Sequence, residues 1–269
     1  MLLADELLKN QMSEIYGPLA QAFFADLKDA GFSDEELKAV PSLFLPGWSE
    51  GYASSPLKIT IAGKETLNWA NDFGDCLLDD YKAAENNQYD PFLSCKRFRD
   101  QGPKEWANTF WQYSAAAIGK IFGQSKEEVM KPDNKILRGI SWFNGHAVET
   151  YYSHGVDDKI SPEKMQQLQD LADKHKLSDF GTFISVFKPQ VILYFYRNSS
   201  GIPVRTFDSP ACELVKRWMF DGDEAIHEYQ WHDTIILNMR HTSWMARGKM
   251  TEQECADMIA KALNERGII

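Results

Sequence analysis

Four short runs of β-branched and aromatic residues recur along this chain of 269 residues, and helix-start signals lie between them. Each run has the length and composition typical of a β-strand; they are Leu57–Ala62, Ile136–Phe143, Val191–Tyr196 and Thr234–Met239. Strands that alternate with helices build βαβ units. We therefore expect a three-layer α/β/α fold with a central, mostly parallel, four-stranded sheet.

The first 56 residues carry no such strand signal. Leu2–Ala30 alternates apolar and polar residues with a roughly helical period, and Ser33–Glu36 has the pattern of a capping box. Pro41–Pro56 is broken by prolines, glycines and serines, but its aromatic residues indicate an ordered loop. We expect residues 1–56 to be a helical lead-in and loop packed on an α/β domain of residues 57–269, a single domain overall.

Charge and cysteine content exclude several classes of protein. The 29 lysines and arginines are outnumbered by 39 acids, so a polyanion would need a local basic face to bind. The 4 cysteines form no C-x-x-C pair, which excludes a zinc ribbon or an iron–sulfur run, and we expect no metal and no cofactor.

The N-terminus and the hydropathy pattern bear on location. Acids stand near the start, where a secretory signal has basic residues, and no apolar run approaches the ~20 residues of a membrane span. We expect a cytoplasmic protein without a membrane partner. The oligomeric state stays open.

Polar residues follow each predicted strand. Glu65 follows the first strand, Asn144 the second, Arg197 the third, and Arg240 and His241 the fourth. In a parallel sheet, ligands bind beyond the carboxyl ends of the strands, so these residues should converge on one crevice. A carboxylate, a carboxamide and an imidazole in an aromatic surround can grip a planar polar ring and assist an anionic leaving group.

Two segments without acids indicate the local basic face. Thr234–Met250 has Arg240, Arg247 and Lys249 but no carboxylate. Ser185–Phe207 also has three cations and no carboxylate. Such a face could hold a phosphate backbone. Short strands and their loops can also lack acids for no functional reason, and that interpretation stays open.

Three segments resemble motifs of the uracil-DNA glycosylase superfamily. Lys58–Trp69 resembles the first motif, a strand that ends in glycine with a water-placing polar residue two positions on. Ile140–Asn144 is similar to the strand whose terminal asparagine reads the base, and Ile235–Ser243 resembles the second motif, a strand ending in His-Pro-Ser. The resemblance extends from about Leu57 to the helix after Thr251 and implies a metal-free branch of the superfamily.

The resemblance implies a DNA N-glycosylase of base-excision repair, a hydrolase that cuts the bond between a uracil-like or damaged base and deoxyribose. Glu65 would orient the water or balance positive charge on the sugar, and His241 would donate to the departing base. Asn144 would bind the base edge, and Phe73 or Trp69 would stack on it. Single- or double-stranded DNA is the implied partner, with its backbone held by Arg197, Arg240, Ser243, Arg247 and Lys249.

Each of these residues also has a purely structural interpretation. Glu65 could cap the helix that begins near Asn68, Asn144 before Gly145 is a ready turn, and most histidines are not catalysts. The alternative function is a non-catalytic nucleic-acid-binding or protein-interaction module that keeps the glycosylase fold.

The segment His227–Asp233 offers a competing site, because it holds two imidazoles and two carboxylates within seven residues. The two histidines are five apart, whereas ligands on one helical face are four apart, so we expect no metal site there.

Overall fold

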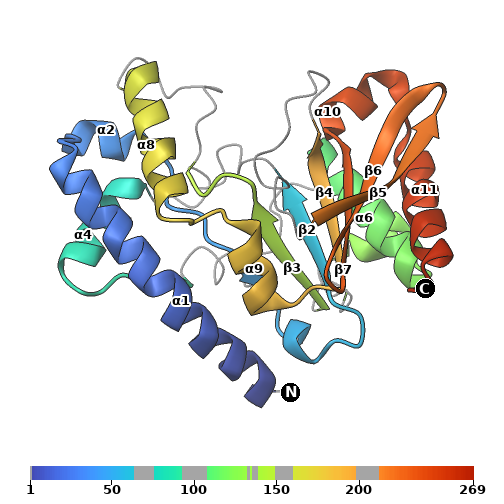
Figure 1. Ribbon diagram of the computed structural model, residues 1–269, viewed down its shortest axis with the longest axis horizontal. Helices are drawn as coiled ribbons and strands as arrows, with labels where there is room; N and C mark the ends of the chain where they lie inside the picture. The colour runs from blue at the N-terminus through green and yellow to red at the C-terminus, as the bar shows by residue number, and fades with distance from the viewer. Residues whose placement is uncertain are drawn as a thin grey trace. The chain divides into compact units, whose positions relative to one another are not determined.

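The computed structural model describes residues 2–63, 76–92, 108–131, 134, 139–148, 160–197 and 212–269. In this part of the chain it is an α/β protein with a seven-stranded mixed sheet of order β1-β3-β2-β4-β7-β6-β5 (Figure 1). The strands are β1 (Gly47–Trp48), β2 (Ile59–Gly63), β3 (Ile140–Asn144), β4 (Val191–Arg197), β5 (Cys212–Phe220), β6 (Asp223–Trp231) and β7 (Thr234–Arg240).

The strands β2, β4 and β7 form the parallel centre of the sheet. β4 pairs in parallel with β2 on one side and with β7 on the other. Their residues are buried along almost the whole length of each strand. Burial on both faces explains why these strands appear in the sequence as continuous apolar runs.

The observed sheet has three strands more than the expected four-stranded, mostly parallel sheet. The four predicted runs correspond to β2, β3, β4 and β7, although residues 136–138 of the second run lie outside the described residues. The prediction missed β1 and the antiparallel pair β5 and β6, which extends the sheet beyond β7. β5 is mostly exposed, so its residues do not show the apolar run that marks a buried strand.

A tight turn connects β5 to β6. Asp221 and Gly222 both adopt positive φ, 46° and 83°. Asp-Gly with positive φ at both positions is the preferred two-residue turn of a β-hairpin, because its twist matches that of the strands. This turn is a sequence signal from which the hairpin could have been predicted.

The described residues belong to two compact units, each discontinuous in sequence. The first, here called the helical unit, comprises residues 1–47, 64–100 and 142–187, and the second, the sheet unit, comprises 48–63, 101–141 and 188–269. The expected boundary at residue 56 stays a prediction.

The helical unit is built around the long helix α1 (Leu2–Asp29), which packs against three other helices. They are α4 (Leu77–Glu85), α8 (Pro162–Lys174) and α9 (Phe180–Phe187). Aromatic rings fill its core: Phe143 stacks on Phe183 with centroids 4.7 Å apart, and Phe183 stacks on Phe187 at the same distance.

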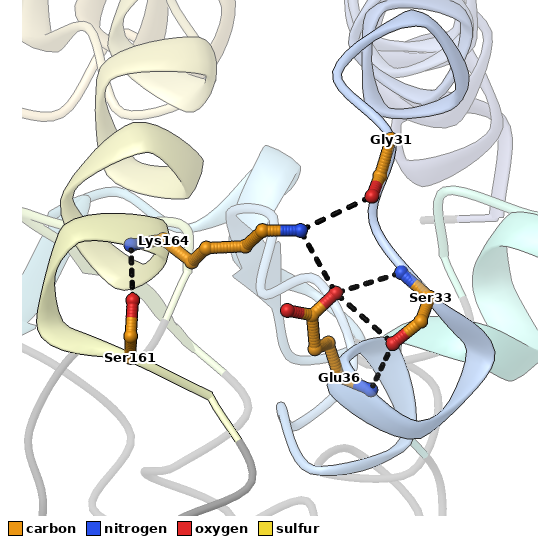
Figure 2. A network of polar contacts seen from close by, with 5 residues as sticks. All are labelled: Gly31, Ser33, Glu36, Ser161 and Lys164. Carbon is orange, nitrogen blue, oxygen red and sulfur yellow. Dashed lines mark hydrogen bonds and ion pairs between the residues drawn. The ribbon is translucent and has the colours of Figure 1, made fainter.

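A polar network ties α8 to the short helix α2 (Asp34–Lys38), as Figure 2 shows. Ser33 and Glu36 form the predicted capping box, with the Ser33 N–H donating to Glu36 Oε2 over 2.8 Å. Lys164 on α8 donates to the same Glu36 oxygen at 3.0 Å and to the carbonyl of Gly31 at 3.1 Å. The Ser33 N–H, helped by Lys164, lowers the pKa of Glu36. Because both ions of the pair are partly exposed, we expect the ion pair to contribute about 1 kcal/mol or less.

In the sheet unit, α6 (Thr109–Phe122) and α11 (Glu252–Glu265) pack together. The rings of Phe110 and Phe195 meet edge to face at 5.7 Å, and Tyr113 Oη donates to the carbonyl of Met250 at 2.6 Å. Phe195 is in register with Met239 of β7, and Met239 with Ile226 of β6. This row of apolar residues therefore lies on the sheet face that α6 covers.

Asp80 of α4 is a buried acid, 5% exposed, whose Oδ2 accepts the N–H of Leu43 at 2.7 Å. Burial raises the pKa of Asp80 to about 7. The unfolded chain loses this proton near pH 4, whereas the folded chain keeps it until about pH 7. The free energy of unfolding should therefore fall as pH rises across this window, by up to about 4 kcal/mol.

Replacement of Asp80 with asparagine removes the titrating group and should flatten this pH dependence. Urea unfolding of the variant at pH 5 and pH 8 measures the change. Asp29→Asn, at an exposed position of the same unit, is the matched control and should keep the wild-type slope. An equal slope in Asp80→Asn and wild type would contradict the assignment.

Among the described residues, no helix combines the length and the apolar character needed to cross a membrane.

Candidate functional site

The carboxyl ends of three parallel strands of the sheet unit lie at one edge. Ala62 of β2 is in register with Tyr194 of β4, and Tyr194 with Asn238 of β7. Beyond this line, the N–H of His241 donates to the carbonyl of Arg197 at 3.3 Å, so the ladder between the strand ends continues past β7. This is the edge at which parallel sheets bind ligands.

His241 occupies the N-cap of α10 (Thr242–Trp244), directly after β7. Its Nδ1 accepts the backbone N–H of Ser243 at 3.3 Å and lies 2.7 Å from Ser243 Oγ. A ring nitrogen that accepts a backbone N–H carries no proton, so this contact assigns the neutral ring's proton to Nε2. Ser243 thus fixes both the orientation of the imidazole and the position of its donor.

A second group of polar residues, here called the strand-end cluster, lies beside it on β4, β5, β6 and β7; its members are Arg197, Arg217, Glu224, His227 and Arg240. Glu224 is at its centre. Glu224 Oε2 lies 2.7 Å from His227 Nε2 and 3.3 Å from Arg197 Nη1, and Oε1 lies 3.6 Å from Arg217 Nε. Arg240 Nε donates to the backbone carbonyl of Glu224 at 3.1 Å.

The charges of the cluster act on each other. The hydrogen bond with His227 and the nearby arginines lower the pKa of Glu224. Burial lowers the pKa of His227, which favours the neutral imidazole. Burial and the neighbouring charge of Arg240 lower the pKa of Arg197.

Six of the predicted site residues belong to the sheet unit, at the end of β4 and between the end of β7 and α11: Arg197, Arg240, His241, Ser243, Arg247 and Lys249. Arg240 lies over the ring of Trp244, with the guanidinium carbon 5.1 Å from the ring centroid. Arg247 and Lys249 are exposed in the turn Met245–Lys249, whereas the Arg197 side chain is only 11% exposed.

The other predicted site residues are elsewhere in the chain. Asn144 ends β3 in the helical unit, where it is 6% exposed. Within residues 2–63, 76–92, 108–131, 134, 139–148, 160–197 and 212–269, its Nδ2 has no hydrogen-bond partner. Glu65, Trp69 and Phe73 lie outside the described residues; β2 ends at Gly63, two positions before Glu65 in the sequence.

Sequence reasoning missed Arg217, Glu224 and the role of His227, because all three lie on the hairpin that it did not predict. From the sequence, the only role that His227 suggests is that of a metal ligand. In the structure it lies on β6 with its side chain against Arg197 and Glu224, while His232 is exposed at the next turn. Within the described residues, no group of three or more histidine, cysteine or acidic side chains is arranged to hold a metal ion.

The sequence matches no protein-family model and none of the curated proteins with which it was compared. The geometry of the strand ends and the motifs in the sequence are therefore the guides to function.

Proposed function

We propose that the protein is a DNA N-glycosylase with a fold of the uracil-DNA glycosylase kind, which hydrolyses the bond between a uracil-like or damaged base and deoxyribose. One observation carries the proposal. His241, held by Ser243 with its proton on Nε2, follows a strand whose carboxyl end shares an edge with that of β2. Glu65 comes two residues after β2 in the sequence.

The chemistry of the reaction suits this pair of side chains. Cleavage of an N-glycosidic bond develops positive charge on the sugar and negative charge on the departing base. In the proposal, the Glu65 carboxylate stabilises the cation or orients the attacking water. The His241 Nε2–H donates to the base oxygen as it gains charge. Fixed groups that act where charge develops lower the barrier most.

Recognition is divided among the remaining residues. In the proposal, Asn144 binds the edge of the extruded base, to which its unpartnered Nδ2 could donate, and Phe73 or Trp69 stacks on the face of the base. Arg247 and Lys249 are exposed and follow His241 in the sequence. In the proposal, they hold the phosphate backbone.

Incubation with oligonucleotides tests the proposal. Single- and double-stranded substrates with uracil or another altered base are incubated with the purified protein, and abasic sites are then cut by alkali. We expect strand scission at the altered base and none in the matched unmodified oligonucleotide. Binding without scission of any substrate would contradict the proposal and favour a non-catalytic module.

Replacement of Arg247 with alanine should weaken oligonucleotide binding for all sequences and reduce the salt slope of log K by about 1, because one phosphate contact is lost. Fluorescence anisotropy titrations at several salt concentrations measure this slope. Lys131→Ala, at an exposed position to which no site role is assigned, should keep the wild-type slope. A wild-type slope in Arg247→Ala would remove this residue from the interface.

A further inference from the structure

Arg197 has one side of its guanidinium group without a partner. Its Nε and Nη2 are buried, and neither makes a hydrogen bond with the part of the chain that the structure describes. These two nitrogens form the edge with which arginine binds a carboxylate or phosphate through two parallel hydrogen bonds. Buried charged donors without acceptors are costly, so this edge calls for an acceptor that the described residues do not supply.

The other side of the same group is held in place. Arg197 Nη1 contacts His227 Nε2 and lies 3.3 Å from Glu224 Oε2. Glu224 Oε2 can accept both from Arg197 Nη1 and from His227 Nε2, so this carboxylate holds the guanidinium and the imidazole together. Because Nη1 is clamped, the planar guanidinium has a fixed orientation, and so does its unpartnered edge.

The strand-end cluster is positively charged as a whole. Three guanidinium groups, those of Arg197, Arg217 and Arg240, are opposed by the single carboxylate of Glu224, which leaves two positive charges while His227 is neutral. A phosphate monoester carries about −1.5 to −2 charges near pH 7, whereas a carboxylate or a phosphodiester carries one.

A further unpartnered acceptor lies in the same region. Asn238 is 3% exposed and is in register with His227 on the neighbouring strand. Its Oδ1 has no hydrogen-bond partner among the described residues. Asn238 and Arg197 thus offer complementary groups, an acceptor and two donors. A protonated phosphate oxygen or a ligand hydroxyl group would satisfy the acceptor, and the other phosphate oxygens would satisfy the donors.

We propose that the strand-end cluster binds a terminal phosphate group, with two of its oxygens on the Nε and Nη2 edge of Arg197. Because the Arg197 side chain is only 11% exposed, a group at the end of a ligand fits this position better than a phosphate inside a continuous strand. The ligand is a phosphate monoester, either free or at the end of an oligonucleotide. This inference does not require that the protein cleave bases.

Calorimetric titration with inorganic phosphate tests the site, and acetate serves as the carboxylate probe. We expect one phosphate to bind per chain, more tightly than acetate. Arg197→Gln should weaken phosphate binding by about tenfold to a hundredfold, because a charge-assisted pair of hydrogen bonds is lost. Lys131→Gln, which removes a cation at an exposed position outside the cluster, should stay within about twofold of wild type. Wild-type phosphate affinity in Arg197→Gln, or acetate binding as tight as phosphate binding, would overturn the proposal.

Glu224→Gln provides a second test with the opposite sign. It removes the negative charge that competes with the ligand, so phosphate should bind roughly tenfold more tightly. Glu224 is 39% exposed in its side chain, so this variant also decides the question if Arg197→Gln does not fold. Unchanged or weaker phosphate binding by Glu224→Gln would contradict the assignment.

Two forms of one short oligonucleotide, with a 5′-phosphate and with a 5′-hydroxyl group, distinguish the two sources of the phosphate. If the ligand is a nucleic-acid end, the phosphorylated form binds more tightly, and this advantage disappears in Arg197→Gln. If inorganic phosphate binds but both oligonucleotides bind equally, the ligand is a free monoester. Abasic sites are measured separately, so a failure of the glycosylase proposal leaves the phosphate result intact, and the reverse also holds.

Discussion

Replacement of Glu65 with glutamine is expected to slow base release by roughly a thousandfold or more while oligonucleotide binding is retained. The substitution keeps the size of the side chain but removes the negative charge that would stabilise the developing cation on the sugar. Single-turnover measurement of abasic sites, with protein in excess over substrate, reports the chemical step directly. A parallel binding titration separates catalysis from affinity.

The control for this variant is Glu50→Gln, which makes the same chemical change at an exposed position after β1. It should release the base at the wild-type rate. If Glu65→Gln turned over as fast as wild type, Glu65 would have no part in the reaction, and its role would be reduced to a helix-capping carboxylate.

Replacement of His241 with alanine should slow base release by about a hundredfold to a thousandfold, the usual effect of losing one donor to a developing anion. The loss should appear in the rate of the bound complex and not in the affinity, because the donor acts on charge that is absent from the ground state. The single-turnover rate at saturating protein reports the chemical step, and the protein concentration at half saturation reports the affinity.

His232→Asn is the matched control for His241→Ala. His232 is exposed at the turn between β6 and β7 and has a φ of 50°, a conformation that asparagine tolerates. His232→Asn should leave the rate of base release unchanged. A rate loss in His241→Ala accompanied by an equal loss of affinity would point to a structural role in capping α10.

The central strands and the helix starts could be predicted because both depend on local signals. The runs in β2, β4 and β7 are apolar along their length since both sides of each strand are buried. Capping boxes at Ser125 and Thr251 begin α7 (Lys126–Val129) and α11. Their side chains and backbone close these contacts within one helical turn, so the signal is local.

The hairpin of β5 and β6 shows where such reasoning failed. β5 is exposed and rich in charged residues, so composition alone favours a loop. The Asp221-Gly222 pair is the local signal for the turn, and both residues adopt positive φ in the structure. Pairing with β7 then holds β6 in the sheet. Edge strands depend on a neighbour for their hydrogen bonds, which a local pattern does not encode.

Arg197 illustrates the difference for the candidate site. The sequence places it after a strand and predicts a contact with a phosphate backbone. In the structure its Nη1 is clamped by Glu224 and His227, residues about 30 positions away on β6. Whether an arginine is a free surface cation or an oriented, mostly buried one depends on partners brought by strand pairing.

The sequence by itself determined the α/β class, the carboxyl ends of the central strands and the polar residues that follow them. These depend on burial patterns and on chain order, which any reader of the sequence can follow. The tertiary structure alone decided which cations are oriented and which are exposed, and that Ser243 sets the proton of His241. Charge and tautomer are settled by neighbours within a few ångströms, and only the folded chain brings most of those neighbours together.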